Sequence, residues 1–415
     1  MSPYFKNLTI VLTLLLTACG GGSSTPPPIE VIPTYTPPPS SSGGDTTTYT
    51  GDYSEAIEYI MQDGYYTQGI VIYKDGELLR EDYRDIGEIE RNAIKTKHSH
   101  LTDVVIDERW GGNDTYDKTG TWSITKSITS LLIGIASDKS YLRLDETADR
   151  FIGEWYGRSQ GTIITVEHLV DHRSGLEVMC EGSTSQSVGI PCQTNEDGGT
   201  IQAYQSQKDV CINRNMYSSS NPPPFYDEQR YGSYQQQIHI YSNCDSQNLA
   251  VVLEVATGMS VADFADYNLF SYLGIQDVSW WTDSIGNSLS YCCVEMTLVD
   301  QAKLGQMVLD NDGSVLGEWY IDGINFDESI YSRGFRNYNG WLMMIGFDGQ
   351  FIAMNKEKNM VIVRGSLYHS YNQGSEPYQM NYTVGSYTIP GSLPQGIGLD
   401  PVGVDYINEF LSKID

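Results

Sequence analysis

The order of strand-like and helical segments along the chain is the feature that most constrains the fold. Five short segments with strand character lie at 69–73, 77–80, 341–345, 350–354 and 360–364. The first two are joined across Asp75–Gly76, a pair typical of a tight hairpin turn. Helical patterns fill the chain between the two groups. We therefore expect an α+β fold: one antiparallel sheet formed by N- and C-terminal strands, flanked by helices, with an inserted and mostly helical region.

The helical patterns are of unequal length. Apolar periodicity predicts helices at 124–137, 241–257, 261–272, 298–309 and 404–414. A shorter helix is predicted from the threonine cap Thr165 to His172, and 142–151 reads as a loop with a short helix. The segment 179–240 is rich in Gln, Ser, Tyr, Asn and Pro and shows little periodicity. We interpret it as an insertion.

The first residues have the character of a secretion signal. Lys6 supplies a basic start, and Leu8–Leu16 form an apolar core that is too short to span a bilayer. The sequence Leu16-Thr17-Ala18-Cys19 resembles a bacterial lipobox. We therefore expect a lipoprotein signal peptide over 1–18 and a lipid on Cys19. An ordinary cleaved signal with an incidental cysteine is the alternative.

A tether follows the cysteine. Residues 19–52 are mostly Gly, Ser, Thr and Pro, a composition that cannot bury a core. The remaining 53–415 is long enough for one large domain. This organisation predicts a domain held to the membrane by an N-terminal lipid, on the periplasmic side of the bacterial envelope. The absence of Asp after Cys19 favours the outer membrane.

The net charge bears on possible binding partners, and the cysteine content bears on disulfides and metal sites. The net charge of −28 argues against nucleic-acid binding. Six cysteines beyond Cys19 are expected to form disulfides in an exported chain, and the sequence leaves fifteen pairings open. Four of them fall within 180–244, so the insertion is predicted to be stapled. No spacing supports a metal site, and we expect no metal and no organic cofactor.

One Ser-x-x-Lys sequence stands at the start of the predicted helix 124–137. Positions three apart lie on one helix face, so Lys126 is expected to sit over the hydroxyl of Ser123. A serine needs a neighbouring base to act as a nucleophile, and a desolvated lysine can serve. A solvated Ser and Lys on an ordinary helix is the other interpretation of this pattern.

Taken together, these segments resemble the serine β-lactamase and penicillin-binding-protein superfamily, and most closely its class C-related branch with esterases and aminohexanoate-dimer hydrolases. The resemblance covers roughly 65–370 and the closing helix. Four motifs carry it: Ser123-Ile-Thr-Lys126, Ile164 to Leu176 with its His-Arg-Ser-Gly-Leu ending, Tyr241-Ser-Asn243, and Gly346-Phe-Asp-Gly-Gln350.

The resemblance implies a role for each matching residue. Ser123 is the expected nucleophile, Lys126 its partner base, and Tyr241 the group that moves the proton. Asn243 is expected to hold the substrate amide or to orient the lysine. The expected oxyanion hole consists of the backbone N–H groups of Ser123 and Gln350, with Gly349 allowing close approach. His172 is expected to be structural, and Trp122 and Trp341 are expected either to line the cleft or simply to pack.

One departure from the pattern of the superfamily affects the expected substrate. Where the superfamily places Lys or His in its third motif, this chain has Phe347, which cannot bind a carboxylate. Small esters or amides without that group fit better. A Lys118-Thr-Gly120 tripeptide lies upstream of Ser123, in the wrong place for the third motif, and is interpreted as incidental. Tyr406-Ile-Asn408 is treated likewise.

The sequence therefore predicts a serine hydrolase that acts through an acyl-enzyme on a small ester or amide. A peptidoglycan-directed D-amino-acid peptidase or weak β-lactamase is the alternative within enzymes. A ligand-binding or sensor module that kept the fold without turnover is the alternative outside them. The substrate itself and the oligomeric state are not predicted.

Overall fold

The computed structural model describes most of the chain after the predicted tether. The described residues are 53–97, 102–179, 186–187, 190–191, 201, 204–223, 238–310, 316, 331–338, 340–366, 381–383, 386–388 and 404–414. The predicted signal peptide, Cys19, the tether and the cysteines Cys180 and Cys192 lie outside them. Within the described residues no single helix is long and apolar enough to span a membrane, although the bent pair Asn243–Thr257 and Val261–Phe270 meets the length and composition criterion jointly.

A six-stranded sheet joins the two ends of the chain, as the sequence predicted. Its order is β2-β1-β11-β10-β9-β8, and every neighbouring pair is antiparallel. The strands are β1 Thr67–Lys74, β2 Glu77–Tyr83, β8 Arg336–Tyr338, β9 Trp341–Ile345, β10 Phe351–Asn355 and β11 Met360–Ser366. The Asp75–Gly76 turn has positive φ at both residues, which is the conformation that this pair adopts readily. The α+β class and the sheet built from both ends are thereby confirmed.

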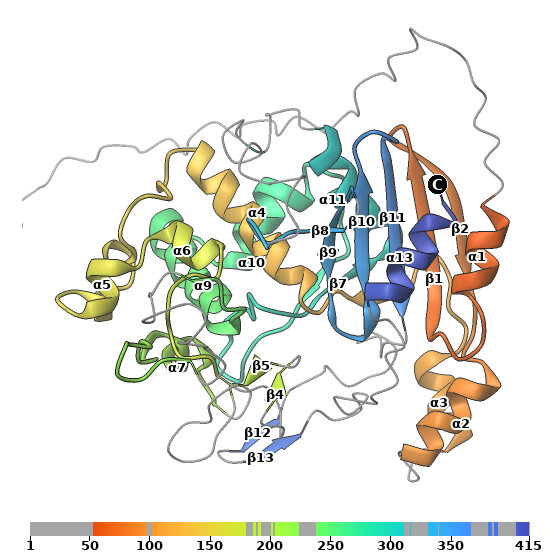
Figure 1. Ribbon diagram of the computed structural model, residues 1–415, viewed down its shortest axis with the longest axis horizontal. Helices are drawn as coiled ribbons and strands as arrows, with labels where there is room; N and C mark the ends of the chain where they lie inside the picture. The colour runs from red at the N-terminus through yellow and green to blue at the C-terminus, as the bar shows by residue number, and fades with distance from the viewer. Residues whose placement is uncertain are drawn as a thin grey trace, which may run out of the picture. The chain divides into compact units, whose positions relative to one another are not determined.

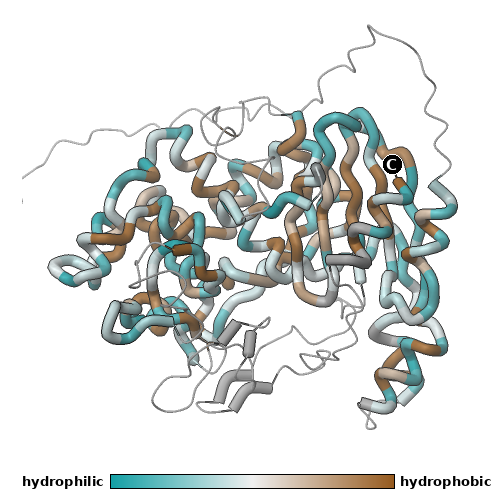
Figure 2. Tube along the Cα trace, in the orientation of Figure 1, coloured by the Kyte–Doolittle hydropathy of each residue, from teal (hydrophilic) through white to brown (hydrophobic). Residues whose placement is uncertain are grey.

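Alternation of side chains along each strand produces two cores. Ile70 and Ile72 of β1 pack in a cluster with α1 Ser54–Ile60 and α13 Val404–Ser412. Val71, between them, belongs to the larger cluster on the other face. Since successive strand residues point to opposite faces, both sides of the sheet are covered. Figure 1 shows α1 and α13 on one side of the sheet and α4 and α11 on the other; hydrophobic residues concentrate in the strands between them (Figure 2).

The helices follow the predicted pattern with some additions. They are α2 Glu88–Lys97, α3 Asp103–Trp110, α4 Ile124–Asp138, α5 Ser159–Ile163, α6 Val166–Val170, α7 Gln207–Ile212, α9 Asn243–Thr257, α10 Val261–Ala265 and α11 Leu298–Asp310, with 3₁₀ turns η1 Ala148–Arg150, η2 Gly153–Trp155 and η5 Phe347–Gly349, and a π turn η4 Asp266–Phe270. Thr165 caps α6 as expected, and Gly258 ends α9 in the left-handed conformation. The helix predicted at 261–272 is divided between α10 and η4.

A second, three-stranded sheet lies beside the start of α4. It has the order β3-β7-β6, with β3 Lys118–Gly120, β7 Val294–Thr297 and β6 Ser279–Trp280. The incidental Lys-Thr-Gly tripeptide forms β3, where the buried Lys118 ammonium donates to Asp277 and Ser279 at 2.8 Å each. This lysine therefore has a structural partner. Two short hairpins complete the described strands, β4 Gln186–Ser187 with β5 Ile190–Pro191 and β12 Asn381–Thr383 with β13 Ser386–Thr388.

Candidate active site

The Ser-x-x-Lys motif adopts the geometry that its spacing predicts. Ser123 is the N-cap residue of α4, yet its side chain makes no capping hydrogen bond. Instead, the Lys126 ammonium donates to Ser123 Oγ at 3.0 Å and to the carbonyl oxygen of Tyr291 at 2.7 Å. Lys126 is buried, and none of the carboxylates in the described part of the chain forms an ion pair with it. The lysine amine is thereby directed at the serine hydroxyl.

The turn before Ser123 is held in an unusual conformation. Trp122 has φ +47, which is rare for a bulky residue and costs conformational energy. The preceding Thr121 N–H donates to the carbonyl of Val294 at 2.8 Å, and its hydroxyl donates to the same oxygen at 2.9 Å. The first residue of β7 therefore fixes the path by which the chain enters α4.

Tyr241 and Asn243 are brought to the same place at the start of α9. The ammonium of Lys126 lies 4.8 Å from the centre of the Tyr241 ring. Ser242, between the two residues, caps α9 by accepting from the N–H of Asp245 at 3.3 Å. Asn243 is buried in the first turn. The structure thus groups Ser123, Lys126 and Tyr241, and the proton-transfer role assigned to Tyr241 stays a prediction.

The His-Arg-Ser-Gly stretch positions the start of α9. His172 Nδ1 accepts from the N–H of Ser242 at 3.2 Å, so its proton is on Nε2, which donates to Ser246 Oγ at 3.1 Å. Burial, followed by the nearby His239, Lys126 and Arg336, holds the pKa of His172 well below its usual value. A neutral histidine with two fixed partners is consistent with the structural role expected for it.

A buried carboxyl group supports the same helix. The Ser174 hydroxyl donates to Asp245 Oδ1 at 2.7 Å. Burial raises the pKa of Asp245 from 3.8 to about 7, while its hydrogen bonds with Ser174 and Ser242 act in the opposite direction. Asp245 could not be predicted from the sequence, because its partner Ser174 lies 71 residues away.

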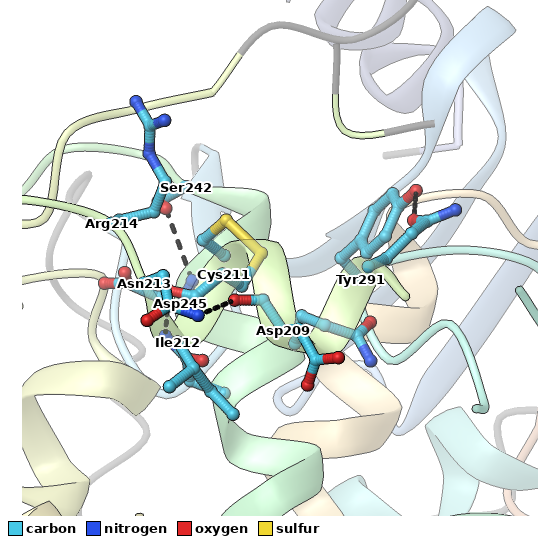
Figure 3. Close-up of a disulfide and its surroundings, with 12 residues drawn as sticks. Asp209, Cys211, Ile212, Asn213, Arg214, Ser242, Asp245 and Tyr291 are labelled. Atoms are coloured by element: carbon cyan, nitrogen blue, oxygen red, sulfur yellow. Dashed lines mark hydrogen bonds between the residues drawn. A yellow bond between two sulfur atoms is a disulfide. The ribbon is translucent and has the colours of Figure 1, made fainter. Parts of the chain in front are cut away.

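A disulfide connects the insertion to the site. Cys211 at the end of α7 is bonded to Cys244 at the start of α9, with 4.9 Å between their Cα atoms (Figure 3). This bond links the segment 179–240 to α9 close to Tyr241, and the interpretation of that segment as an insertion stays a prediction. A second disulfide joins the adjacent residues Cys292 and Cys293. Sequence alone could not choose either pairing.

The third-motif segment forms the 3₁₀ turn η5, and several of its polar groups bond to the neighbouring sheet. The N–H of Gln350 donates to the Phe347 carbonyl at 3.4 Å, closing η5. Its side chain points toward β11, where it donates to Ser366 Oγ at 3.1 Å and accepts from the Ser366 N–H at 3.0 Å. The Gly349 carbonyl accepts from the buried Arg364 at 2.6 Å. Gly349 and Gln350 are thus both hydrogen-bonded to residues of β11.

The glycine that meets the nucleophile turn is Gly346. A Cβ at this position would lie 2.3 Å from the Thr121 carbonyl oxygen, so only glycine fits without movement. The next residue, Phe347, has its ring centre 5.6 Å from that of Trp122. The N–H groups of Ser123 and Phe347 have no acceptor among the described residues. Trp122 also contacts Trp281, at 5.8 Å.

Sequence reasoning missed Arg336 and left the place of Trp341 open. The Arg336 guanidinium lies 5.6 Å from the ring centres of both Tyr241 and Tyr331, and no described carboxylate pairs with it. The only sequence signal was its place one strand before the third motif.

Trp341, by contrast, is buried among the residues that face α1 and α13, so it packs in the core and does not line the cleft.

Comparisons with known proteins agree with this architecture. The profile of the family described as Beta-lactamase matches residues 103–288. Similar solved structures include one named as a candidate 6-aminohexanoate-dimer hydrolase from Bacillus anthracis, at 17% identity and TM-score 0.54, covering 87% of this chain and 79% of that one. Another is named as a candidate β-lactamase from Bacteroides dorei DSM 17855, at 14% identity and TM-score 0.53, covering 88% and 99%.

A third structure, EstCE1, is named as a hydrolase with promiscuous acyltransferase activity, at 12% identity and TM-score 0.50, covering 78% of this chain and 94% of its own. No curated protein sequence matches the chain. The chain has the fold of the β-lactamase/transpeptidase-type serine hydrolases. At these identities the structural similarity establishes the fold alone.

Proposed function

We propose that the protein is a serine hydrolase that cleaves a small ester or amide through an acyl-enzyme. The observation that carries the proposal is the 3.0 Å hydrogen bond between the buried Nζ atom of Lys126 and Ser123 Oγ. A base at hydrogen-bond distance is what a serine hydroxyl needs to become a nucleophile. The relatives named as hydrolases are compatible with this chemistry.

In the proposed reaction, Ser123 Oγ attacks the substrate carbonyl carbon as its proton passes to the Lys126 amine. The bond to the leaving group then breaks, and that group takes a proton from the Lys126–Tyr241 pair. Water attacks the resulting ester in the second half, with the same groups moving its proton, and the acid is released. No other reactant is required.

The oxyanion would be bound by the N–H groups of Ser123 and Phe347. This assignment replaces Gln350, whose N–H already has an acceptor in η5. Two fixed donors directed at a developing oxyanion typically contribute several kcal/mol to lowering the barrier. The close approach of Gly346 to the Thr121 carbonyl supports this assignment, because Phe347 directly follows the glycine and Ser123 lies two residues after the threonine.

A second candidate, a D-amino-acid peptidase or weak β-lactamase, is favoured by one observation. The sequence argued against substrates with a carboxylate because Phe347 offers no cation. Arg336 places one beside Tyr241 from a different strand. A comparison of neutral and carboxylate-bearing esters in wild type and Arg336→Gln distinguishes the two candidates. Selective loss of the anionic substrate in the variant supports the second candidate, and equal rates on both support the first.

Turnover measurements test the main proposal. Wild type is expected to hydrolyse a short-chain p-nitrophenyl ester, and Ser123→Ala is expected to lose that activity with little change in melting temperature. Ser127→Ala is the matched control, because Ser127 lies one turn further along α4 and donates to the Gly334 carbonyl instead. Retention of most activity in Ser123→Ala would refute the mechanism. Slow acylation without turnover would favour the binding-module alternative.

The place in the cell is proposed from the sequence alone. The lipobox-like Leu16 to Cys19 and the polar tether support a lipoprotein anchored in the bacterial envelope, and the four motifs of the domain support its place in the class C-related branch. Metabolic labelling with a palmitate analogue tests this proposal. Label should enter the wild-type protein and be absent from Cys19→Ala.

A further inference from the structure

The segment that precedes β7 contains a disulfide between adjacent residues, Cys292 and Cys293. Both side chains are buried, in a cluster that includes Trp281 and contacts Trp122. Cys293 has φ +83, a region that residues with a side chain rarely adopt. Strained backbone of this kind persists where the surroundings determine it, and often beside functional groups.

Hydrogen bonds tie this segment to the face of α4 that carries the lysine. On one side of the disulfide, the Tyr291 carbonyl accepts from Lys126 Nζ at 2.7 Å. One residue earlier, the Ser290 carbonyl accepts from the Thr129 hydroxyl at 2.8 Å. The disulfide therefore follows directly after the backbone group that holds the proposed base.

On the other side of the disulfide, Val294 at the start of β7 holds the turn that leads to Ser123. The Val294 N–H donates to the Thr125 hydroxyl at 3.0 Å. The Val294 carbonyl accepts both hydrogen bonds from Thr121, the residue before Trp122. Cys292 and Cys293 are thus the link between the backbone that holds Lys126 and the backbone that holds the approach to Ser123.

A disulfide between neighbours cannot act by closing a long loop. The stabilisation expected from a disulfide grows with the length of chain that it closes, and here the sequence separation is 1. The bond between Cys211 and Cys244 spans a separation of 33. The bond between Cys292 and Cys293 can therefore act mainly on local backbone conformation.

We propose that the Cys292–Cys293 disulfide is a positioning device that fixes the Tyr291 carbonyl, and through it Lys126, relative to Ser123. The proposal rests on the proposed function, because it concerns the geometry of the base in that reaction. It assigns the pair no contact with the reacting atoms. Its effect on acylation is exerted through the backbone.

Two double variants test the proposal. Cys292→Ser/Cys293→Ser removes the bond and leaves a residue with a side chain at positive φ, whereas Cys292→Ser/Cys293→Gly removes the bond but lets the backbone keep that conformation. We expect the Ser/Ser variant to lose about 10- to 100-fold in kcat for the p-nitrophenyl ester, since small misplacements of catalytic groups have effects of this size. Its KM should change far less, and the Ser/Gly variant should recover most of the loss.

The rate of fluorophosphonate labelling, followed by intact-protein mass, provides the second measurement. Equal rates in the Ser/Ser and Ser/Gly variants, whether fast or slow, would overturn the proposal, as would a wild-type rate in Ser/Ser. If Ser/Ser does not accumulate as a folded protein, Ser/Gly is compared with wild type, and a loss as large as the one expected for Ser/Ser overturns the proposal. Wild type is labelled first: failure there refutes the proposed function itself, so the two failures are distinguishable.

Discussion

The two segments that meet at the candidate site use their polar groups in opposite ways. In 121–126, the Ser123 hydroxyl and the Lys126 ammonium face each other, and the turn is held from outside by Val294. In 346–350, most polar groups face the sheet, since Gln350 is bonded to Ser366 and Gly349 to Arg364. The comparison separates residues that are expected to carry chemistry from residues that hold the backbone in place.

The largest expected effect is on the base in the first segment. Lys126→Met keeps the length of the side chain and removes the amine, so kcat should fall by about 10²- to 10⁴-fold, the usual contribution of a general base. The Tyr291 carbonyl would also lose its donor, which costs about 1–3 kcal/mol of stability. Ester turnover and thermal unfolding measure the two effects. Activity within threefold of wild type would contradict the assignment.

The next prediction concerns the backbone of the second segment. Phe347 is the first residue of η5, where proline is compatible with the helix and removes only the N–H donor. Phe347→Ala is the control, because it loses the same ring but keeps the N–H. Proline should be slower than alanine in kcat by about 10²- to 10³-fold, as for loss of one oxyanion donor. Equal rates would return Gln350 to consideration as the second donor.

Gln350 should show the reverse pattern, with stability affected and activity retained. Gln350→Leu leaves the Ser366 N–H without its acceptor, a loss that costs about 1–3 kcal/mol when the group is buried. Because the side chain points toward β11, kcat should stay close to wild type. Denaturant unfolding and ester turnover on the same preparation check both statements. A large loss of kcat in a folded variant would place this side chain in the site.

The last prediction is the pH dependence of stability that Asp245 confers. Its pKa is raised by burial from 3.8 to about 7 in the folded protein, so the folded state holds a proton that the unfolded state has released between these values. Stability from this group is therefore complete at low pH and is lost as pH rises through 7, by about 2–3 kcal/mol between pH 5 and pH 8. Asp245→Asn should lose correspondingly less over that interval. Parallel plots of unfolding free energy against pH for the two proteins would contradict the assigned pKa direction.

The features that could be predicted from the sequence are those that depend on regular spacing of residues in helices and strands. Ser123 and Lys126 are three apart on a helix, so their contact follows from helix geometry, and the strands of the sheet follow from alternation. The amphipathic α13 was predicted for the same reason. These features depend on residues close together in the chain.

The features that were missed depend on contacts between distant residues. The direction of Gln350 is set by Ser366 on another strand, and Arg336 on β8 lies beside Tyr241, which is far from it in the chain. Adjacent cysteines carry no periodic signal, so the Cys292–Cys293 bond was one of many possible pairings. The short helix α7 lies in a segment without apolar periodicity and becomes fixed through Cys211.

The most direct measurement is intact-protein mass after incubation with a fluorophosphonate, followed by peptide mapping of the adduct. A nucleophile activated by Lys126 predicts one adduct on wild type, located on Ser123, and none on Ser123→Ala. An adduct on another residue, or labelling of Ser123→Ala at the wild-type rate, would contradict the claim that Ser123 is the nucleophile.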